Sequence, residues 1–375
     1  MSLSLPAEPP RARSLPRVVP EVLSALDGGG DWFAPVTSAV LFVVDGLGAR
    51  NLGARSGHAR FLAEAGGKKD VARSVFPSTT AAALTSLMTG VDPGEHGLLG
   101  YRVRIPGTDL APNQLKGWET DGLDPYSWQR AQPLLEREAE RGRPCFVVSR
   151  PKFAESGFTT AILRGGEFVP AKTAAEGAEA AAELAARHPG ALVYLYAPEL
   201  DGIGHQRGWE SDEWAAGLET VDAAARALAG ALPRGVGAVF TADHGMIDVP
   251  RHRHLLLTER DGLVDGVRII GGEPRMLHLY AEPGCEASVL RAWCESESGR
   301  SWVLSRDEAV EAGVFGVVAP DVRERIGDVV VAARAAVAYY DDRLEDKGPQ
   351  NMVGQHGSLT DEERTVPLIR LGAFA

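Results

Sequence analysis

The stretch VLFVVDG, residues 40–46, is a short apolar run that ends in an aspartate and a glycine. β-Branched and aromatic residues followed by a turn signal predict a buried strand. Two later runs have the same form: ALVYLY (191–196) precedes Asp201, and GAVF (237–240) precedes Asp243. Helical patterns lie between these runs, and such alternation predicts a largely parallel sheet with helices on both faces. The fold class is therefore α/β.

The helical patterns cover residues 57–65, 81–88, 133–141, 173–187 and 213–232. The fourth of these, TAAEGAEAAAELAAR, has strong helix propensity throughout. We expect the strands between the helices to end near Asp45, Phe76, Ser149, Tyr196 and Thr241.

Carboxylates and imidazoles follow the predicted strands at several places. In an open α/β sheet, residues beyond the carboxyl ends of the strands converge at one edge. The residues expected there are Asp45, Asp201, His205, Asp243, His244 and His356. Three carboxylates and three imidazoles can hold two adjacent divalent metal ions, and this mixture of oxygen and nitrogen donors favours zinc over magnesium or calcium.

Each piece alone has a simpler interpretation. Asp45-Gly46 could be an ordinary turn, and Asp201 to His205 could be a helix start with a surface histidine. His252 and His254 could share one face of an extended segment, but no third ligand is close in sequence. The complete set, in this order, is what favours a metal site.

A hydroxyl group completes the set. Thr79-Thr80 lies in FPSTTAAALTSLMTG (76–90), between a strand-like piece and an Ala/Leu-rich helix. A threonine at a helix N-terminus lies beside free backbone N–H groups, which favour anions. Because a neighbouring metal dication stabilises its alkoxide, such a threonine can act as a nucleophile.

These motifs together resemble the type I phosphodiesterase/nucleotide pyrophosphatase family of the alkaline phosphatase superfamily, from about Val40 to Ile369. The motifs that carry the resemblance are VVDGLG (43–48), TGVDPGEHG (89–97), DGIGH (201–205), ADHGM (242–246) and GQHGS (354–358). Family members place the nucleophilic threonine nine residues before the Thr-Gly pair that closes the next helix, which selects Thr80 over Thr79.

The resemblance implies an alkaline-phosphatase-like fold and a phospho-threonine intermediate on Thr80. It also implies one metal ion held by Asp201, His205 and His356. A second ion would be held by Asp45, Asp243 and His244, with the Thr80 oxygen as a further ligand. His96, in the PGEHG turn, is expected to be structural support.

One departure from the family pattern concerns the substrate. Phosphodiesterase members usually have Phe-Pro-Asn after the nucleophile, and the asparagine donates to a phosphate oxygen, whereas this chain has Ala81-Ala82-Ala83. Losing such a donor costs on the order of 3 kcal/mol. Phosphodiester or pyrophosphate hydrolysis is favoured, while a phosphomonoesterase, a phosphonate hydrolase and an inactive metal-binding relative remain alternatives.

Residues 248–350 interrupt the alternation of strands and helices. They include a hairpin-like piece (263–284) with Asp265-Gly266 and Gly271-Gly272 as turn signals. We therefore predict an inserted α+β cap at 248–350, a catalytic core at 31–247 and 351–375, and a flexible, proline-rich leader at 1–30. The cap is expected to overhang the site and select the leaving group, with Arg251, Arg253 or Arg275 replacing the missing asparagine.

Composition argues against some classes of binding partner. The net charge of −12 argues against nucleic-acid or anionic-membrane binding, so the expected partner is a small phosphate-ester substrate. The 3 cysteines are too scattered for a disulfide framework. Neither a signal peptide nor an apolar run of membrane-spanning length is recognisable, which favours the cytoplasm. The sequence gives no indication of the oligomeric state.

Overall fold

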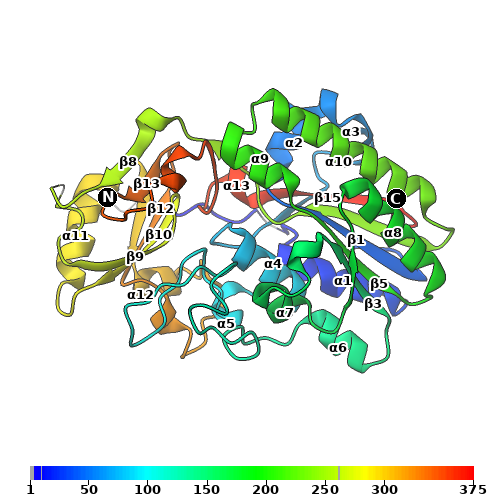
Figure 1. Ribbon diagram of the computed structural model, residues 1–375, viewed down its shortest axis with the longest axis horizontal. Coiled ribbons are helices and arrows are strands. Elements are labelled where there is room, and N and C mark those ends of the chain that lie inside the picture. The colour runs from blue at the N-terminus through cyan, green and yellow to red at the C-terminus, as the bar shows by residue number, and fades with distance from the viewer. Residues whose placement is uncertain (1–3, 10, 261) are drawn as a thin grey trace.

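A seven-stranded sheet with the order β2-β15-β6-β1-β5-β3-β4 forms the main sheet of the protein (Figure 1). The computed structural model describes residues 4–9, 11–260 and 262–375. The parallel strands are β1 (Ser38–Val44), β3 (Cys145–Ser149), β4 (Glu167–Pro170), β5 (Leu192–Ala197) and β6 (Val236–Ala242). β15 (Thr365–Gly372) runs antiparallel to both β6 and β2 (Val71–Arg73). The predicted α/β class and the largely parallel sheet are confirmed.

The central strands are apolar because both faces of the sheet are covered. Every residue of β1 is buried, and β1 pairs in register with β5 on one side and β6 on the other. Phe42 packs edge-on against Phe240, with ring centroids 5.2 Å apart. This pairing places the carboxyl ends of β1, β5 and β6 side by side.

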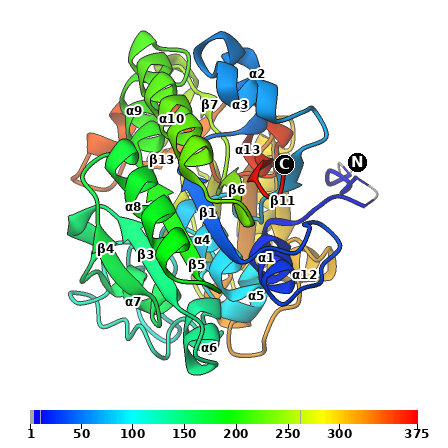
Figure 2. The same ribbon diagram turned by 90° about the vertical axis from the view of Figure 1, so that its right-hand side faces the viewer.

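Helices cover the two faces of the sheet. α8 (Ala174–Arg187) and α10 (Asp212–Ala231) lie on one side, while α1 (Val18–Leu26) and α4 (Thr80–Thr89) lie on the other (Figure 2). The other helices of the core are α2 (Ala49–Ala54), α3 (Arg60–Ala65), α5 (Pro93–His96), α6 (Leu134–Glu140), α7 (Gly157–Leu163), α9 (Glu199–Arg207) and α13 (Asp361–Arg364). Each predicted helix is present, with its ends moved by up to a few residues.

The prediction of a flexible leader is wrong for residues 15–26, which form helical turns. A short 3₁₀ turn, Leu15–Arg17, leads into α1, and Leu15, Val18, Val19 and Val22 are fully buried. Their spacing places them on one face of a helix, and burial of that face against the core fixes the segment. The prolines that favoured a flexible leader lie mostly before this apolar stripe.

Residues 248–350, which we call the insert, form a second sheet. Its order is β11-β12-β10-β9, and all the pairings are antiparallel. The strands are β9 (Val267–Glu273), β10 (Met276–Ala281), β11 (Ser301–Ser305) and β12 (Val329–Ala333), accompanied by α11 (Glu286–Glu297) and α12 (Arg306–Glu311). β8 (His254–Leu257) and β13 (Ala338–Asp341) form a separate parallel pair. We retain the division into core and insert as a proposal.

The predicted hairpin is present, but its turn is not at either glycine signal. β9 and β10 are joined at Pro274-Arg275, and Gly271-Gly272 lies within β9. Gly272 has φ +85°, and its N–H donates to the Arg102 carbonyl at 2.6 Å. A Cβ at this position would lie 2.0 Å from the Met276 carbonyl oxygen, so this glycine marks a close backbone approach and not a turn.

The ends of the insert return to the same place. β7 (Ile247–Asp248) pairs antiparallel with β14 (Gly354–Gln355), directly before His356. Across the described ranges, no helix combines the length and the apolar character needed to cross a bilayer.

Candidate metal centre

The six predicted ligands meet at the carboxyl edge of the main sheet. Asp45 follows β1 directly, and Asp243-His244 follows β6, whose end is in register with that of β1. Asp201 and His205 lie one turn apart on α9. His356 follows β14. The helix-start interpretation of Asp201 to His205 is therefore correct as well, because this helix carries both side chains into the site.

One group consists of Asp45, Asp243 and His244. Their candidate ligand atoms all lie within 4.8 Å of one another. His244 Nε2 is 3.4 Å from Asp45 Oδ1 and 3.5 Å from Asp243 Oδ2. All three residues are buried, and this group is the one that the resemblance implies for one of the two ions.

A second group contains Asp201, His244 and His356, again within 4.8 Å of one another. The resemblance implies His205 in place of His244. His205 Nε2 lies 3.2 Å from Asp201 Oδ1, and His356 Nε2 lies 3.6 Å from the same oxygen. The His244 and His356 rings stack with centroids 3.7 Å apart, so His244 lies between the two groups.

Each histidine of the site is oriented by its backbone contact. Nδ1 of His205 lies 2.8 Å from the Gly354 carbonyl oxygen, and Nδ1 of His356 lies 2.9 Å from that of Ser78. Nδ1 of His244 lies 3.1 Å from the Gly245 carbonyl oxygen. Because a carbonyl oxygen can only accept, each Nδ1 carries the proton, and each Nε2 presents a lone pair to the site.

The charges and unpaired oxygens of the site fit a bound cation. Burial, followed by repulsion from Asp243 and Asp201, raises the pKa of Asp45 well above its ordinary value. Burial also raises the pKa of Asp243, and burial together with the neighbouring His244 and His205 lowers the pKa of His356. Asp201 Oδ1 and Asp243 Oδ2 are buried without a hydrogen-bond partner in the described parts of the chain. Unsatisfied carboxylate oxygens beside imidazole lone pairs fit divalent metal ions.

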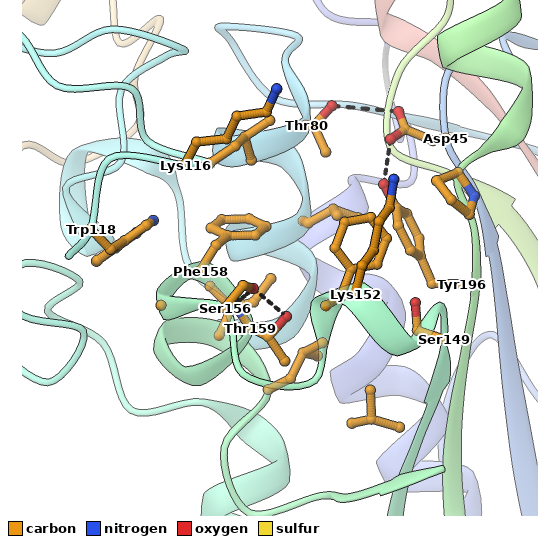
Figure 3. Close-up of a pocket in the computed structure, with 18 of the residues that line it drawn as sticks. Asp45, Thr80, Lys116, Trp118, Ser149, Lys152, Ser156, Phe158, Thr159 and Tyr196 are labelled. Carbon is orange, nitrogen blue, oxygen red and sulfur yellow. Dashed lines mark hydrogen bonds between the residues drawn. The ribbon is translucent and has the colours of Figure 1, made fainter. Parts of the chain in front are cut away.

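Thr80 is the first residue of α4 and lies beside this cluster, as its sequence position predicts. Its hydroxyl donates to Asp45 Oδ1 at 3.4 Å and lies 3.2 Å from His244 Nε2. Figure 3 shows Thr80 and Asp45 facing each other across this hydrogen bond. Thr80 therefore has the contacts expected of a nucleophile beside a metal site.

Tyr196 is a site residue that the sequence reasoning missed. Its hydroxyl donates to Asp45 Oδ2 (Figure 3), and burial followed by the charge of Asp45 raises its pKa well above the ordinary value. Tyr196 pairs in register with Val43 at the end of β1. The pairing of β5 with β1 places Tyr196 beside the first aspartate, and no local sequence signal indicated this register.

A cavity of about 760 Å³ opens beside Thr80 and Asp45. Its aromatic wall includes Trp118, Phe153 and Phe158. Lys116 and Lys152 also line the cavity, and their amino groups point toward Thr80 and Asp45 (Figure 3). The cavity thus combines apolar surface with two positive charges, and neither lysine was predicted.

The expected role of the insert in this cavity is contradicted. Among the described residues that line the cavity, none belongs to the insert. Arg275 is fully buried in an ion pair with Glu363, so it is wrong as a replacement for the missing asparagine. Arg251 and Arg253 are exposed in a 3₁₀ turn and do not line the cavity. Arg275 was selected for its charge alone, and its pairing with Glu363, which is far away in the sequence, could not be recognised from that charge.

The remaining histidines of the motifs have structural contacts. His96 is fully buried, with Nε2 2.8 Å from Ser86 Oγ, and its Nδ1 accepts from the Leu98 N–H at 3.1 Å. His254 Nε2 lies 3.1 Å from the Val249 carbonyl oxygen, and His252 is exposed. Neither His252 nor His254 belongs to the two candidate groups found among the described residues.

Comparison with known proteins identifies the family. A sequence profile of the type I phosphodiesterase/nucleotide pyrophosphatase family matches residues 39–359. No match was found among curated protein sequences.

Solved structures share the fold. An inactive variant of murine ectonucleotide pyrophosphatase/phosphodiesterase 5, in complex with AMP, superposes with a TM-score of 0.68 at 16% identity, covering 90% of this chain and 88% of that chain. Phosphonoacetate hydrolase from Sinorhizobium meliloti 1021, in complex with phosphonoformate, gives a TM-score of 0.67 at 20% identity and covers 90% of each chain. Since the family profile extends over most of its length, this protein belongs to the type I phosphodiesterase/nucleotide pyrophosphatase family and is a hydrolytic enzyme.

Proposed function

We propose that the protein hydrolyses phosphate esters, with phosphodiesters or pyrophosphates favoured, through a phospho-threonine intermediate on Thr80. The observation that carries this proposal is the position of the Thr80 hydroxyl, 3.4 Å from Asp45 Oδ1 and 3.2 Å from His244 Nε2, at the start of α4. Both neighbours belong to a candidate metal-ligand group.

The proposed centre holds two divalent ions, with zinc favoured by the nitrogen-rich donor set. Asp201, His205 and His356 hold one ion, and Asp45, Asp243 and His244 hold the other. When bound, the ions supply positive charge that favours the ionised hydroxyl and stabilises charge developing on the substrate phosphate.

In the first displacement the Thr80 hydroxyl gives up its proton to solvent and its oxygen forms a bond to phosphorus, while the bond from phosphorus to the leaving group breaks and the leaving group departs. In the second displacement the oxygen of a water molecule forms a bond to phosphorus and the bond from phosphorus to the Thr80 oxygen breaks, so that the phosphate product is released and the Thr80 oxygen takes back a proton. The first-turn N–H groups of α4 have no partners within the helix and face the negative charge of the phosphate. The Tyr196 hydroxyl holds Asp45 in place during both steps.

Lys116 and Lys152 favour a second candidate function within the same superfamily. The amino group of Lys116 points toward Thr80 and that of Lys152 toward Asp45 (Figure 3), and the asparagine usual in phosphodiesterase members is replaced by Ala83. One lysine can donate to a phosphate oxygen, and the other can bind a second anionic group. Phosphonoformate, held by the phosphonoacetate hydrolase of similar fold, has a carboxylate beside its phosphonate. Hydrolysis of a phosphonate with a second acidic group is therefore the alternative.

Turnover of a substrate panel tests the proposal. Protein loaded with zinc or manganese would be assayed with chromogenic phosphate mono- and diesters, nucleoside triphosphates and phosphonocarboxylates. Thr80→Ala should abolish turnover of every accepted substrate and retain about two zinc ions per chain, because only the attacking oxygen is lost. Thr79→Ala is the matched control and should be much milder. Loss of activity in Thr79→Ala, with Thr80→Ala still active, would show that the other hydroxyl is the nucleophile.

Elemental analysis tests the metal assignment separately. Purified active protein should contain close to two transition-metal equivalents per chain. An active preparation that contains only magnesium would contradict the assignment of zinc.

A further inference from the structure

Arg275 and Glu363 form a fully buried ion pair between the insert and the core. Arg275 Nε donates to Glu363 Oε1 at 2.8 Å, and Nη2 donates to Oε2 at 2.9 Å. The other guanidinium N–H groups donate to the carbonyl oxygens of Ala333, Ala335 and Val337 at 3.1, 2.8 and 2.8 Å. The pair is therefore bidentate, and every donor of the guanidinium is satisfied.

Such a pair is weak evidence for stability, because removing two charges from water costs several kcal/mol per ion. The position of the pair suggests a more specific role than stability. Arg275 lies in the turn between β9 and β10 of the insert, and Glu363 lies on α13, close after the His356 loop. The pair thus joins the insert to the segment that carries a candidate metal ligand.

Glu363 is connected to both candidate metal groups. Its Oε1 also accepts from the Ser358 N–H at 3.0 Å, two residues after His356. Its backbone carbonyl accepts from the Gly245 N–H at 2.8 Å, directly after His244. One residue therefore holds the two backbone segments whose imidazoles stack against each other.

The turn of the insert also contacts the His356 loop beside the ion pair. A Cβ on Gly357 would lie 2.6 Å from Glu273 Cγ, so the two segments are in tight contact. The Ser358 hydroxyl donates to the Ala333 carbonyl of β12 at 2.5 Å. The insert therefore contacts the His356 loop at both Gly357 and Ser358.

We propose that the Arg275–Glu363 ion pair is a positioning device that fixes His244 and His356 relative to each other, so that the insert determines the affinity of the centre for metal ions. The insert does this without contributing a ligand or a cavity wall. The inference rests on the metal sites of the proposed function. Outer partners that orient metal ligands typically change metal affinity by about 10- to 100-fold.

Zinc affinity of the metal-free protein tests this proposal. Zinc ion alone would be titrated in competition with a chromophoric chelator, and folding would be checked by circular dichroism. Arg275→Met should weaken zinc binding by about 10- to 100-fold. Arg275→Lys should fall between Arg275→Met and the wild type, because it keeps the charge but loses the two-pronged geometry. Wild-type zinc affinity in folded Arg275→Met would overturn the proposal.

A matched control separates positioning from general loss of a buried charge pair. Glu138 on α6 is 1% exposed and accepts from Arg143 Nε at 2.9 Å, and it does not belong to the metal groups. Glu138→Gln should leave zinc affinity unchanged even if it lowers the melting temperature. A similar loss of zinc affinity in Glu138→Gln would show that the effect is nonspecific and would overturn the proposal.

A double variant covers the case in which Arg275→Met does not fold. Arg275→Met with Glu363→Leu removes both charges, and such replacements are often tolerated. We expect weak zinc binding in this variant too, because the contacts to Ser358 are lost; recovery of wild-type affinity would overturn positioning by the pair. These measurements need no turnover, so failure of the phosphate-ester proposal would be distinguishable from failure of this one.

Discussion

At the scale of single residues, the sequence indicated the candidate ligands and the proposed nucleophile but not the residues that contact them. Thr80 could be selected over Thr79 because the spacing to Thr89 is local information. Tyr196, Lys116 and Lys152 acquire their roles from contacts between segments far apart in the chain. Such contacts leave no spacing signal, and an isolated lysine in a loop is usually solvated.

Tyr196→Phe should lower kcat/KM by about 10- to 100-fold, because a hydrogen bond to a charged group is worth about 1.5–3 kcal/mol. Steady-state kinetics with the best substrate of the panel would measure the loss. Tyr194→Phe is the control, since Tyr194 lies on the same face of β5 and also lines the cavity. Equal kinetics for Tyr196→Phe and the wild type would mean that the contact with Asp45 has no catalytic role.

Lys116→Ala and Lys152→Ala should discriminate between substrates. For substrates with a second anionic group, we expect at least one variant to raise KM about 10-fold or more, as expected for loss of a charge-assisted contact. A chromogenic monoester without a second anion should change less. Lys172→Ala offers a control, because Lys172 does not line this cavity. Uniform effects on all substrates would argue against recognition of a second anion.

At the scale of secondary-structure elements, periodic patterns predicted the helices well, whereas proline content misled the prediction at the N-terminus. The stripe Leu15, Val18, Val19 and Val22 has helical spacing but is short, and its burial depends on the core. The β9–β10 turn was also placed wrongly, because Gly272 serves a close contact with the Met276 carbonyl. Local signals therefore predicted the positions of most helices and strands, but they did not predict the structural role of every glycine or proline.

His96 on α5, which contacts Ser86 on α4, should make the free energy of unfolding depend on pH. Burial lowers the pKa of His96 from 6.5 to about 3. Between these two pH values, position 96 therefore binds more protons in the unfolded chain than in the folded one. The contribution of neutral, buried His96 to the free energy of unfolding is lost as pH falls from 6.5 toward 3. Its steepest slope is about 1.4 kcal/mol per pH unit.

Chemical denaturation of metal-free protein between pH 4.5 and 6.5 would measure this dependence. His96→Gln should flatten the profile relative to the wild type, while His252→Gln, at an exposed position, should not. The candidate ligand histidines are common to all three proteins, so any contribution from them cancels in the comparison. Parallel profiles for His96→Gln and the wild type would exclude the expected contribution.

At the scale of the whole molecule, strand–helix alternation predicted a parallel sheet and the edge at which the ligands meet. It did not predict that the insert packs behind the His356 loop and leaves the cavity wall to the core. The Arg275–Glu363 pair joins the insert to the core there, and its members are separated by 88 positions. Pairings at such separation are decided by tertiary packing and cannot be read from periodicity.

Removal of metal ions should destabilise the entire core. Asp45, Asp201 and Asp243 bring three carboxylates together, and two of their buried oxygens have no hydrogen-bond partner among the described residues. Each ion should add about 2.7 kcal/mol to the free energy of unfolding at a free concentration 100-fold above its Kd. Thermal unfolding with a chelator, followed by zinc addition, would reveal a lowered and then restored melting temperature. An unchanged melting temperature in protein shown to be metal-free would contradict this expectation.

The cavity beside Thr80 draws most of its wall from one continuous stretch of chain, residues 115–168. A single gene segment therefore encodes most of the cavity wall, while the candidate metal ligands are encoded before and after it. Recombination or grafting of that cassette could exchange substrate preference and keep the hydrolytic chemistry. In this architecture, a change of substrate range would require no change in the candidate metal ligands.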